Sequence, residues 1–228
     1  MNRRNVAATA HTTAGLRIAS RLEAMDVDVI EIRADALLGD GLTVDEIANA
    51  MGRIELPLLL TVRHPAEGGI GALSLSRRRE VFDRLAPFAA LMDIELRSAA
   101  ALATLITDAR ANGVCIVISD HHFIRTPALA DLLDRQRRAV HAGADIFKLA
   151  THTPTPRELA RLLEFMATQA PCRHAVMGMG EFGQVSRLAL AKAGSVLNYG
   201  YLDEPNATGQ WEARELRQLI TTIEAAKA

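Results

Sequence analysis

One lysine stands apart from the other basic residues of this chain. Of 26 basic side chains only three are lysines: Lys148, Lys192 and Lys227. Lys192 lies in a helix-like segment and Lys227 lies one residue from the C-terminus, and both are natural places for a solvated ammonium. Lys148 instead lies in the apolar segment GADIFKLAT, where an ionised ammonium is costly unless it is paired. Two interpretations follow: a nucleophilic amine in a buried site, or a lysine at a strand end that extends to water.

Other charged or reactive side chains recur at the ends of short apolar segments. They are Glu31, Arg33, Asp35, Arg63, His64, Glu67, Asp93, Glu95, His121, His122, Lys148, Arg187 and Gln210. Each of them alone is typical of a solvated or salt-bridged surface group. If the segments end at one mouth of a barrel, a lysine, a histidine, three arginines and a glutamate converge there. Such a set would form an anion-receiving site with a nucleophilic amine.

The elements that must position these residues recur at regular intervals. Eight apolar segments rich in strand-forming residues are 5–10, 27–33, 57–63, 90–96, 114–119, 144–150, 174–179 and 196–201. Segments with helical periodicity lie between or after them, namely 16–25, 44–51, 78–88, 100–113, 127–143, 156–169, 186–194 and 212–228. Eight strand–helix repeats in 228 residues predict an α/β fold, a (β/α)8 TIM barrel, rather than a doubly wound sheet. No Pro-, Ser- or Gly-rich linker divides the chain, so we expect a single barrel domain over residues 1–228.

Composition restricts the class of partner. The 26 basic and 27 acidic side chains give a net charge of −1, which argues against a nucleic acid or an anionic membrane as an electrostatic partner. No apolar segment approaches the ~20 residues of a membrane-spanning helix, and the N-terminus lacks a secretory signal pattern. Cys115 and Cys172 show no ligand spacing. We therefore expect a cytoplasmic protein with free thiols.

The spacing of the candidate ligands indicates neither a metal nor a dinucleotide. The histidines lack metal-ligand spacing, and the adjacent His121 and His122 should point to opposite faces of an extended strand. A GxGxxG motif occupies residues 178–183, but it follows the seventh strand rather than the first, so a nicotinamide site is disfavoured. Two interpretations of this loop stay open: a phosphate cradle, or a carboxylate site supplied by Arg187.

Seven motifs, in order along the chain, resemble the type I 3-dehydroquinate dehydratases. They are EIRAD, TVRHPAEGG, DIEL, ISDHHF, GADIFKLAT, MGMGEFGQVSR and a late GQ, and the likeness runs from Asn5 to the C-terminus. The resemblance implies a (β/α)8 barrel, commonly a homodimer, that dehydrates 3-dehydroquinate to 3-dehydroshikimate in the shikimate pathway. It also implies that the reaction uses neither a metal nor an organic cofactor.

The resemblance further implies a role for each matching residue. By that likeness Lys148 forms an imine with the substrate ketone, His121 transfers the proton and Glu67 orients the histidine. The residues that would bind the substrate are Glu31, Arg33, Arg63, Arg187, Gln210, Asn206 and Thr9. General chemistry fits these roles, because an imine is an electron sink and a histidine titrates near neutral pH. A lysine attacks only as the neutral amine, which burial near the arginines would favour.

The chain departs from the family pattern at several places. His122 follows the expected catalytic histidine where an aspartate is usual, and Thr9 replaces a first-strand serine. In the segment 205–210, which we expect to form a lid, Asn206 and Thr208 replace a serine and a proline. Two alternatives stay open: a class I aldolase-like barrel that forms imines with a phosphorylated substrate, and a barrel that only binds a ligand or partner. Retention of the lysine–histidine pair disfavours the second.

Overall fold

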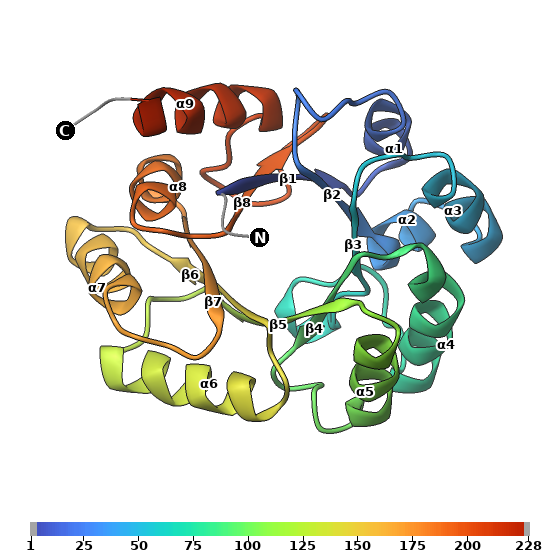
Figure 1. Cartoon of the computed structure of the whole chain (residues 1–228), viewed down its shortest axis with the longest axis horizontal. Helices are drawn as coiled ribbons and strands as arrows, with labels where there is room; N and C mark the ends of the chain where they lie inside the picture. Colours follow the sequence, from blue (N-terminus) through green and yellow to red (C-terminus); the bar gives the residue numbers. More distant parts are fainter. Residues whose placement is uncertain (1–3, 226–228) are drawn as a thin grey trace.

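The computed structural model describes residues 4–225, and within them eight parallel strands are surrounded by helices (Figure 1). The strands are β1 Asn5–Ala10, β2 Val29–Arg33, β3 Leu58–Thr61, β4 Leu91–Glu95, β5 Cys115–His122, β6 Ile146–His152, β7 Arg173–Met179 and β8 Leu197–Tyr201. Their hydrogen-bonded order is β7-β6-β5-β4-β3-β2-β1-β8. At the remaining seam the Val196 N–H donates to the His174 carbonyl at 2.8 Å. The strands form a nearly closed barrel, which confirms the predicted TIM-barrel fold.

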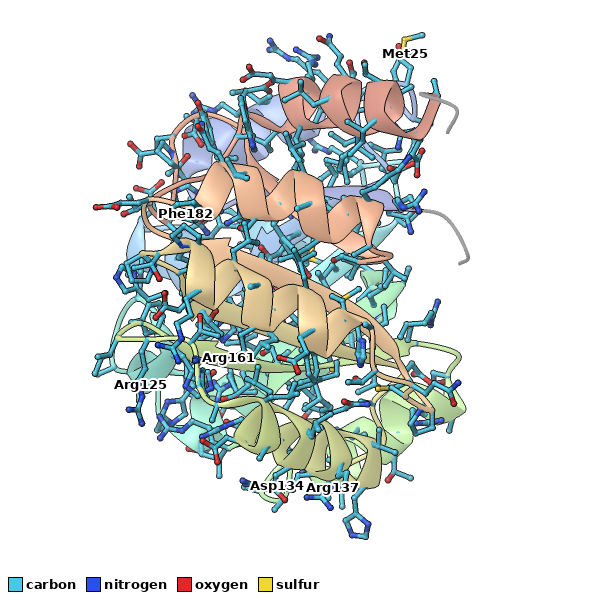
Figure 2. The ribbon with its side chains drawn as sticks, turned by 90° about the vertical axis from the view of Figure 1, so that its left-hand side faces the viewer. Met25, Arg125, Asp134, Arg137, Arg161 and Phe182 are labelled. Carbon is cyan, nitrogen blue, oxygen red and sulfur yellow. The ribbon has the colours of Figure 1, made fainter. Side chains whose placement is uncertain are left out.

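Helices and 3-10 turns follow the strands on the outside of the barrel (Figure 1). They are α1 Thr13–Ala19, α2 Ala34–Gly39, α3 Val44–Met51, η1 Pro65–Glu67, α4 Leu75–Leu85, η2 Ala86–Phe88, α5 Ala103–Ala111, α6 Leu129–His141, α7 Pro156–Met166, α8 Gly183–Lys192 and α9 Ala213–Ala225. Figure 2 shows α6 to α9 following one another along one side of the molecule. Gly113, Gly143 and Gly194 follow helix ends with positive φ, as the sequence predicts for left-handed caps. Within residues 4–225, no helix is both long enough and apolar enough to cross a bilayer.

The first helix differs from its predicted position. It covers Thr13–Ala19 rather than 16–25, because Thr12 caps it by accepting the Gly15 N–H. The chain then turns, and the Asp26 carboxylate stabilises this turn by accepting the Glu23 N–H at 3.1 Å. At the other end of the chain, the final residues of the predicted helix 212–228, including Lys227, lie outside the described residues.

Two strand ends also differ from the sequence prediction, and both differences affect the site. α2 begins directly after β2, so Asp35 lies in the first turn of a helix, although the alternation of an extended strand would place it on one face with Glu31 and Arg33. β5 extends to His122, so both adjacent histidines lie on the strand, on opposite faces. The extension follows from pairing with β6, whose register continues to His122 opposite Thr151.

The barrel interior changes character along the strands. Its base is filled by buried apolar side chains: Val29, Leu59, Leu91, Val117, Ile146 and Leu197. Two residues further along five of the same strands, the inward side chains are buried but polar: Glu31, Thr61, Asp93, Ser119 and Lys148. A separate apolar core lies between the strands and the helices. Because all the strands run the same way, the apolar base supports a polar layer at their carboxyl ends.

Candidate active site

A cavity lies at the carboxyl end of the barrel, above this polar layer. It encloses about 580 Å³, including the part that is open to solvent. All ten residues to which the family resemblance assigns a role line it: Thr9, Glu31, Arg33, Arg63, Glu67, His121, Lys148, Arg187, Asn206 and Gln210. They come from β1, β2, β5, β6, the segment after β3, α8 and the segment after β8. Residues separated by up to 200 positions therefore face one small space.

Lys148 is the buried amine of this cavity, with only 4% of its surface exposed. Its Nζ donates to Asp93 Oδ2 at 2.8 Å and to Glu31 Oε1 at 3.3 Å. The ring of Tyr199 lies below the ammonium, 4.0 Å from Nζ to the ring centre. The charged groups in contact with Nζ are thus carboxylates. The expectation that nearby arginines and burial favour the neutral amine stays a prediction. Lys148 attacks only as the neutral amine, so its contact with Asp93 has to break first.

The two carboxylates that hold Lys148 remain ionised. Burial by itself raises the pKa of Asp93, but Arg63 and Lys148 outweigh it and hold the pKa far below its usual range. Burial of Glu31 is likewise outweighed, chiefly by Lys148 and then by Arg33, so its pKa is also lowered. Neither group is therefore a good resting place for the lysine proton. The natural acceptor is the oxygen of a carbonyl substrate as the amine adds to it.

Arg63 belongs to a buried ion-pair network. Its guanidinium donates to both oxygens of Asp93 at 3.0 and 2.9 Å and to Glu95 Oε1 at 3.1 Å. The other oxygen of Glu95 accepts from Arg78, a fully buried arginine of α4, at 2.5 Å. The sequence analysis missed Arg78, because nothing in a helical run of three arginines marks the one that points inward. This network fixes the wall behind Lys148.

Arg33 is similarly committed to a carboxylate. Its Nε and Nη2 donate to the two oxygens of Asp35 at 2.9 and 2.8 Å. Asp35 also accepts the backbone N–H groups of Arg63 and Ile70 at 3.1 and 3.0 Å. Asp35 thus ties the start of α2 to the segment after β3, which carries Glu67.

His121 forms a hydrogen-bonded pair with Glu67. Its Nδ1 lies 2.9 Å from Glu67 Oε2, and its backbone N–H donates to the same oxygen at 3.2 Å. Burial lowers the pKa of His121 well below its usual value, and the positive charges of Arg63 and Lys148 lower it further. Burial, followed by the charge of Glu95, raises the pKa of Glu67 to about 8. The imidazole is therefore neutral at pH 7, and because Nδ1 is bound to Glu67, Nε2 is the ring nitrogen that faces a substrate.

The neighbouring His122 faces away from this cavity. Its Nε2 lies 2.9 Å from Asp120 Oδ2, and Arg135 of α6 donates to the same oxygen at 2.9 Å. His122 is not among the residues that line the cavity with His121. The predicted divergence of the two side chains is confirmed.

Arg187 differs electrostatically from the other cations of the cavity. It is 2% exposed, and its guanidinium donates only to backbone carbonyls, those of Tyr199 at 3.0 Å and Gly209 at 3.2 Å. Burial lowers its pKa to about 10. No carboxylate among residues 4–225 forms an ion pair with it, whereas Arg33, Arg63 and Lys148 all have such partners. The cavity therefore carries a buried positive charge that lacks an anion.

The segment after β8 closes one side of the cavity. Gln210 Oε1 accepts the backbone N–H groups of Asn206 and Ala207 at 2.9 and 3.3 Å. The Gly180 N–H donates to the Thr208 carbonyl at 3.0 Å. A Cβ on Gly183 would lie 2.7 Å from the Gly209 carbonyl oxygen, so only glycine fits there. The GxGxxG glycines thus let this segment approach the start of α8, where Arg187 contacts it.

Comparison with known proteins decides the family. The model of the type I 3-dehydroquinase family matches residues 8–227. The chain belongs to this family. The family predicted from the motifs is thus confirmed, and membership assigns to the chain the dehydration of 3-dehydroquinate, a step of the shikimate pathway.

Individual members agree with this assignment along most of their length. The 3-dehydroquinate dehydratase of Methanocella arvoryzae is 35% identical over 195 residues, 85% of this chain and 86% of the relative. The catabolic 3-dehydroquinate dehydratase of Acinetobacter baylyi is 30% identical over 212 residues, 89% of this chain and 78% of the relative. The solved structure of the Aquifex aeolicus 3-dehydroquinate dehydratase has a TM-score of 0.83 at 26% identity and covers 96% of this chain and 99% of that one.

Several residues that line this cavity escaped the sequence analysis. The cavity is also lined by Gly68, Phe123, Ala150, Met177, Met179, Tyr199 and Ala207. Met177 and Met179 are two apart on β7, so the alternation of a strand could have placed both on the inward face. Tyr199 lies on β8 and is 3% exposed, but one tyrosine in an apolar strand carries no signal of its own.

Proposed function

We propose that the chain dehydrates 3-dehydroquinate to 3-dehydroshikimate through an imine on Lys148, with His121 as the proton acceptor and donor. The observation that carries this proposal is the combination of a buried lysine, a neutral imidazole and one buried arginine without an anion, all lining one cavity. The substrate supplies the missing groups, a ketone for the amine and a carboxylate for the arginine.

Imine formation begins with loss of a proton from Lys148. Once the ammonium leaves Asp93 and becomes neutral, Nζ attacks the ketone carbon, and the carbonyl oxygen leaves as water. The resulting iminium takes up the electron pair of the adjacent C–H bond as His121 Nε2 removes the proton, giving an enamine. The enamine electrons then expel the hydroxyl on the next carbon, to which His121 returns the proton, so that water departs. Hydrolysis of the imine releases the enone and restores the amine.

The remaining residues bind and orient the substrate. Arg187 receives the substrate carboxylate, and Gln210 and Asn206 close over it from the segment after β8. Glu67 fixes the tautomer and direction of the His121 ring. The ring hydroxyls of the substrate meet Glu31, Arg33 and Arg63, whose ion-pair partners hold them in place. Thr9 donates to Glu31 Oε2 at 2.9 Å and so orients that carboxylate.

We further propose that the chain acts as one barrel domain, forms a homodimer and works in the cytoplasm. Cys115 and Cys172 are free, and burial raises the pKa of both thiols, which suits a reducing compartment. Light scattering coupled to gel filtration measures the oligomeric state, and a monomer at working concentration would contradict the dimer.

Reductive trapping tests the mechanism. Incubation with 3-dehydroquinate and borohydride should reduce the imine and add one substrate-derived mass to the peptide that contains Lys148. Lys148→Met should give no adduct and almost no turnover, whereas Lys192→Met serves as the matched control, because Lys192 Nζ donates to the carbonyl of Ile223 near the surface. Recovery of the adduct on Lys192, or full activity of Lys148→Met, would contradict the imine mechanism.

A further inference from the structure

A second polar cavity adjoins the catalytic pair His121–Glu67, between the turn after β4 and α6. Arg97 of that turn lines it, together with Arg135 and Arg138 of α6. The cavity encloses about 590 Å³, including the part that is open to solvent. His121 and Glu67 line both this cavity and the catalytic one. Three guanidiniums from two elements therefore lie beside the catalytic pair.

Only some of these arginines form an ion pair with a carboxylate. Arg135 Nη1 donates to Asp120 Oδ2 at 2.9 Å, so this charge is balanced. Arg97 Nε lies 3.7 Å from Glu67 Oε1, which is too long for a hydrogen bond, so this contact leaves the N–H donors of Arg97 available. No carboxylate in the described part of the chain pairs with Arg138. Two positive charges therefore remain for a ligand.

We propose that this second cavity binds a small oxyanion of charge minus two, inorganic phosphate or a phosphate monoester, between Arg97 and Arg138. Each planar guanidinium presents paired N–H donors that match two oxygens of a phosphate. Arg97 and Arg138 balance two negative charges, and Arg135, already held by Asp120, lines the same cavity. The site is separate from Arg187, which lines the catalytic cavity but not this one.

Binding at this cavity affects the reaction through Arg97. Glu67 Oε1 faces Arg97, while Glu67 Oε2 holds His121 at 2.9 Å. An anion bound to Arg97 competes with Glu67 for this guanidinium. The positive charge of Arg97 then acts less on the pair His121–Glu67. We expect kcat to fall about two- to fivefold, the effect of weakening one partly exposed charged contact, with little change in KM.

Calorimetric titration with inorganic phosphate tests the site without relying on the reaction. The Arg187→Met background removes the anion receptor of the catalytic cavity, and phosphate should still bind there with unchanged affinity. Arg97→Gln and Arg138→Gln should each weaken binding about tenfold or more. Sodium chloride at equal ionic strength separates specific binding from screening.

Arg137→Gln is the matched control. Arg137 is adjacent to Arg138 on α6 but pairs with Asp134 at 3.1 Å. Figure 2 shows the side chains of Arg137 and Asp134 on the solvent side of the helix. This variant should bind phosphate like the parent. Loss of binding in Arg187→Met with retention in Arg97→Gln and Arg138→Gln would assign the phosphate to the catalytic cavity and overturn the proposal. Absence of phosphate binding to the parent would also overturn it.

Steady-state kinetics test the coupling. Phosphate should lower kcat of the parent and leave kcat of Arg97→Gln unchanged. Inhibition that only raises KM, in the parent and in Arg97→Gln alike, would contradict coupling through Arg97. If the chain failed to dehydrate 3-dehydroquinate, the binding measurement would still decide the site, so the two proposals fail independently.

Discussion

Replacement of Arg187 by methionine should stabilise the free enzyme and at the same time abolish tight substrate binding. Arg187 is a 2% exposed cation whose guanidinium meets two backbone carbonyls and no carboxylate among the described residues. Its charge is therefore compensated only when an anionic substrate arrives. Methionine keeps much of the length of the side chain and removes the charge.

The magnitude follows from the pKa of Arg187, which burial lowers from the usual arginine value to about 10. At 1.36 kcal/mol per pKa unit, the charged side chain destabilises the fold by roughly 3 kcal/mol at all pH values below about 10. The two hydrogen bonds that the variant loses contribute about 1 kcal/mol each. The net gain in the free energy of unfolding is about 1 kcal/mol, or ~2–4 °C in Tm for a chain of this size. KM should rise ~30-fold or more, because one partner of a buried charge pair is removed.

Urea denaturation at pH 7 and initial rates, followed by the enone absorbance of the product, measure the two effects. Arg33→Met is the control, because Arg33 is paired with Asp35 and its removal leaves a buried carboxylate alone. That variant should lose about 3–5 kcal/mol of stability. An Arg187→Met enzyme that is several kcal/mol less stable than the parent, or that keeps the parental KM, would refute the reasoning.

Three further predictions concern the catalytic pair and the lid. His121→Ala should lower kcat ~100-fold or more, whereas His122→Asp should be tolerated, and initial rates that show the reverse order would exchange the two assignments. Gln210→Ala should raise KM while borohydride still traps the imine, and unchanged kinetics would remove Gln210 from the site. Glu67→Gln should remove a pH dependence of stability: burial raises the pKa of Glu67 from 4.5 to about 8, so the parent loses stability as pH rises between these values. Urea denaturation at pH 5 and pH 8 checks this, and an identical loss in both proteins would contradict it.

The barrel could be read from the sequence because its pattern repeats. Apolar strand segments and amphipathic helices alternate eight times, and a parallel sheet requires that order. The first and last residues of an element were less predictable where a local hydrogen bond from a side chain sets them. The cap at Thr12 and the turn held by Asp26 shift the first helix, and α2 begins without a capping side chain, so periodicity alone does not mark it.

The candidate site was accessible from the sequence because strand ends meet at one mouth. The position of Lys148 in an apolar strand and the order of the motifs sufficed to select ten of the 17 residues that line the cavity. Arg78 and Tyr199 escaped because their roles come from contacts across the fold. A buried arginine on a helix looks like a solvated one until its partner, here Glu95, is located.

The sequence by itself determined the fold class, the family and most of the residues that line the cavity. These depend on periodicity, on residue type and on order along the chain, all of which are local properties. Only the tertiary structure decided the charge state of the site: Lys148 paired with Asp93, His121 neutral beside Glu67, and Arg187 without an anion. Protonation depends on burial and on distances between groups from different strands, and these exist only once the chain has closed the barrel.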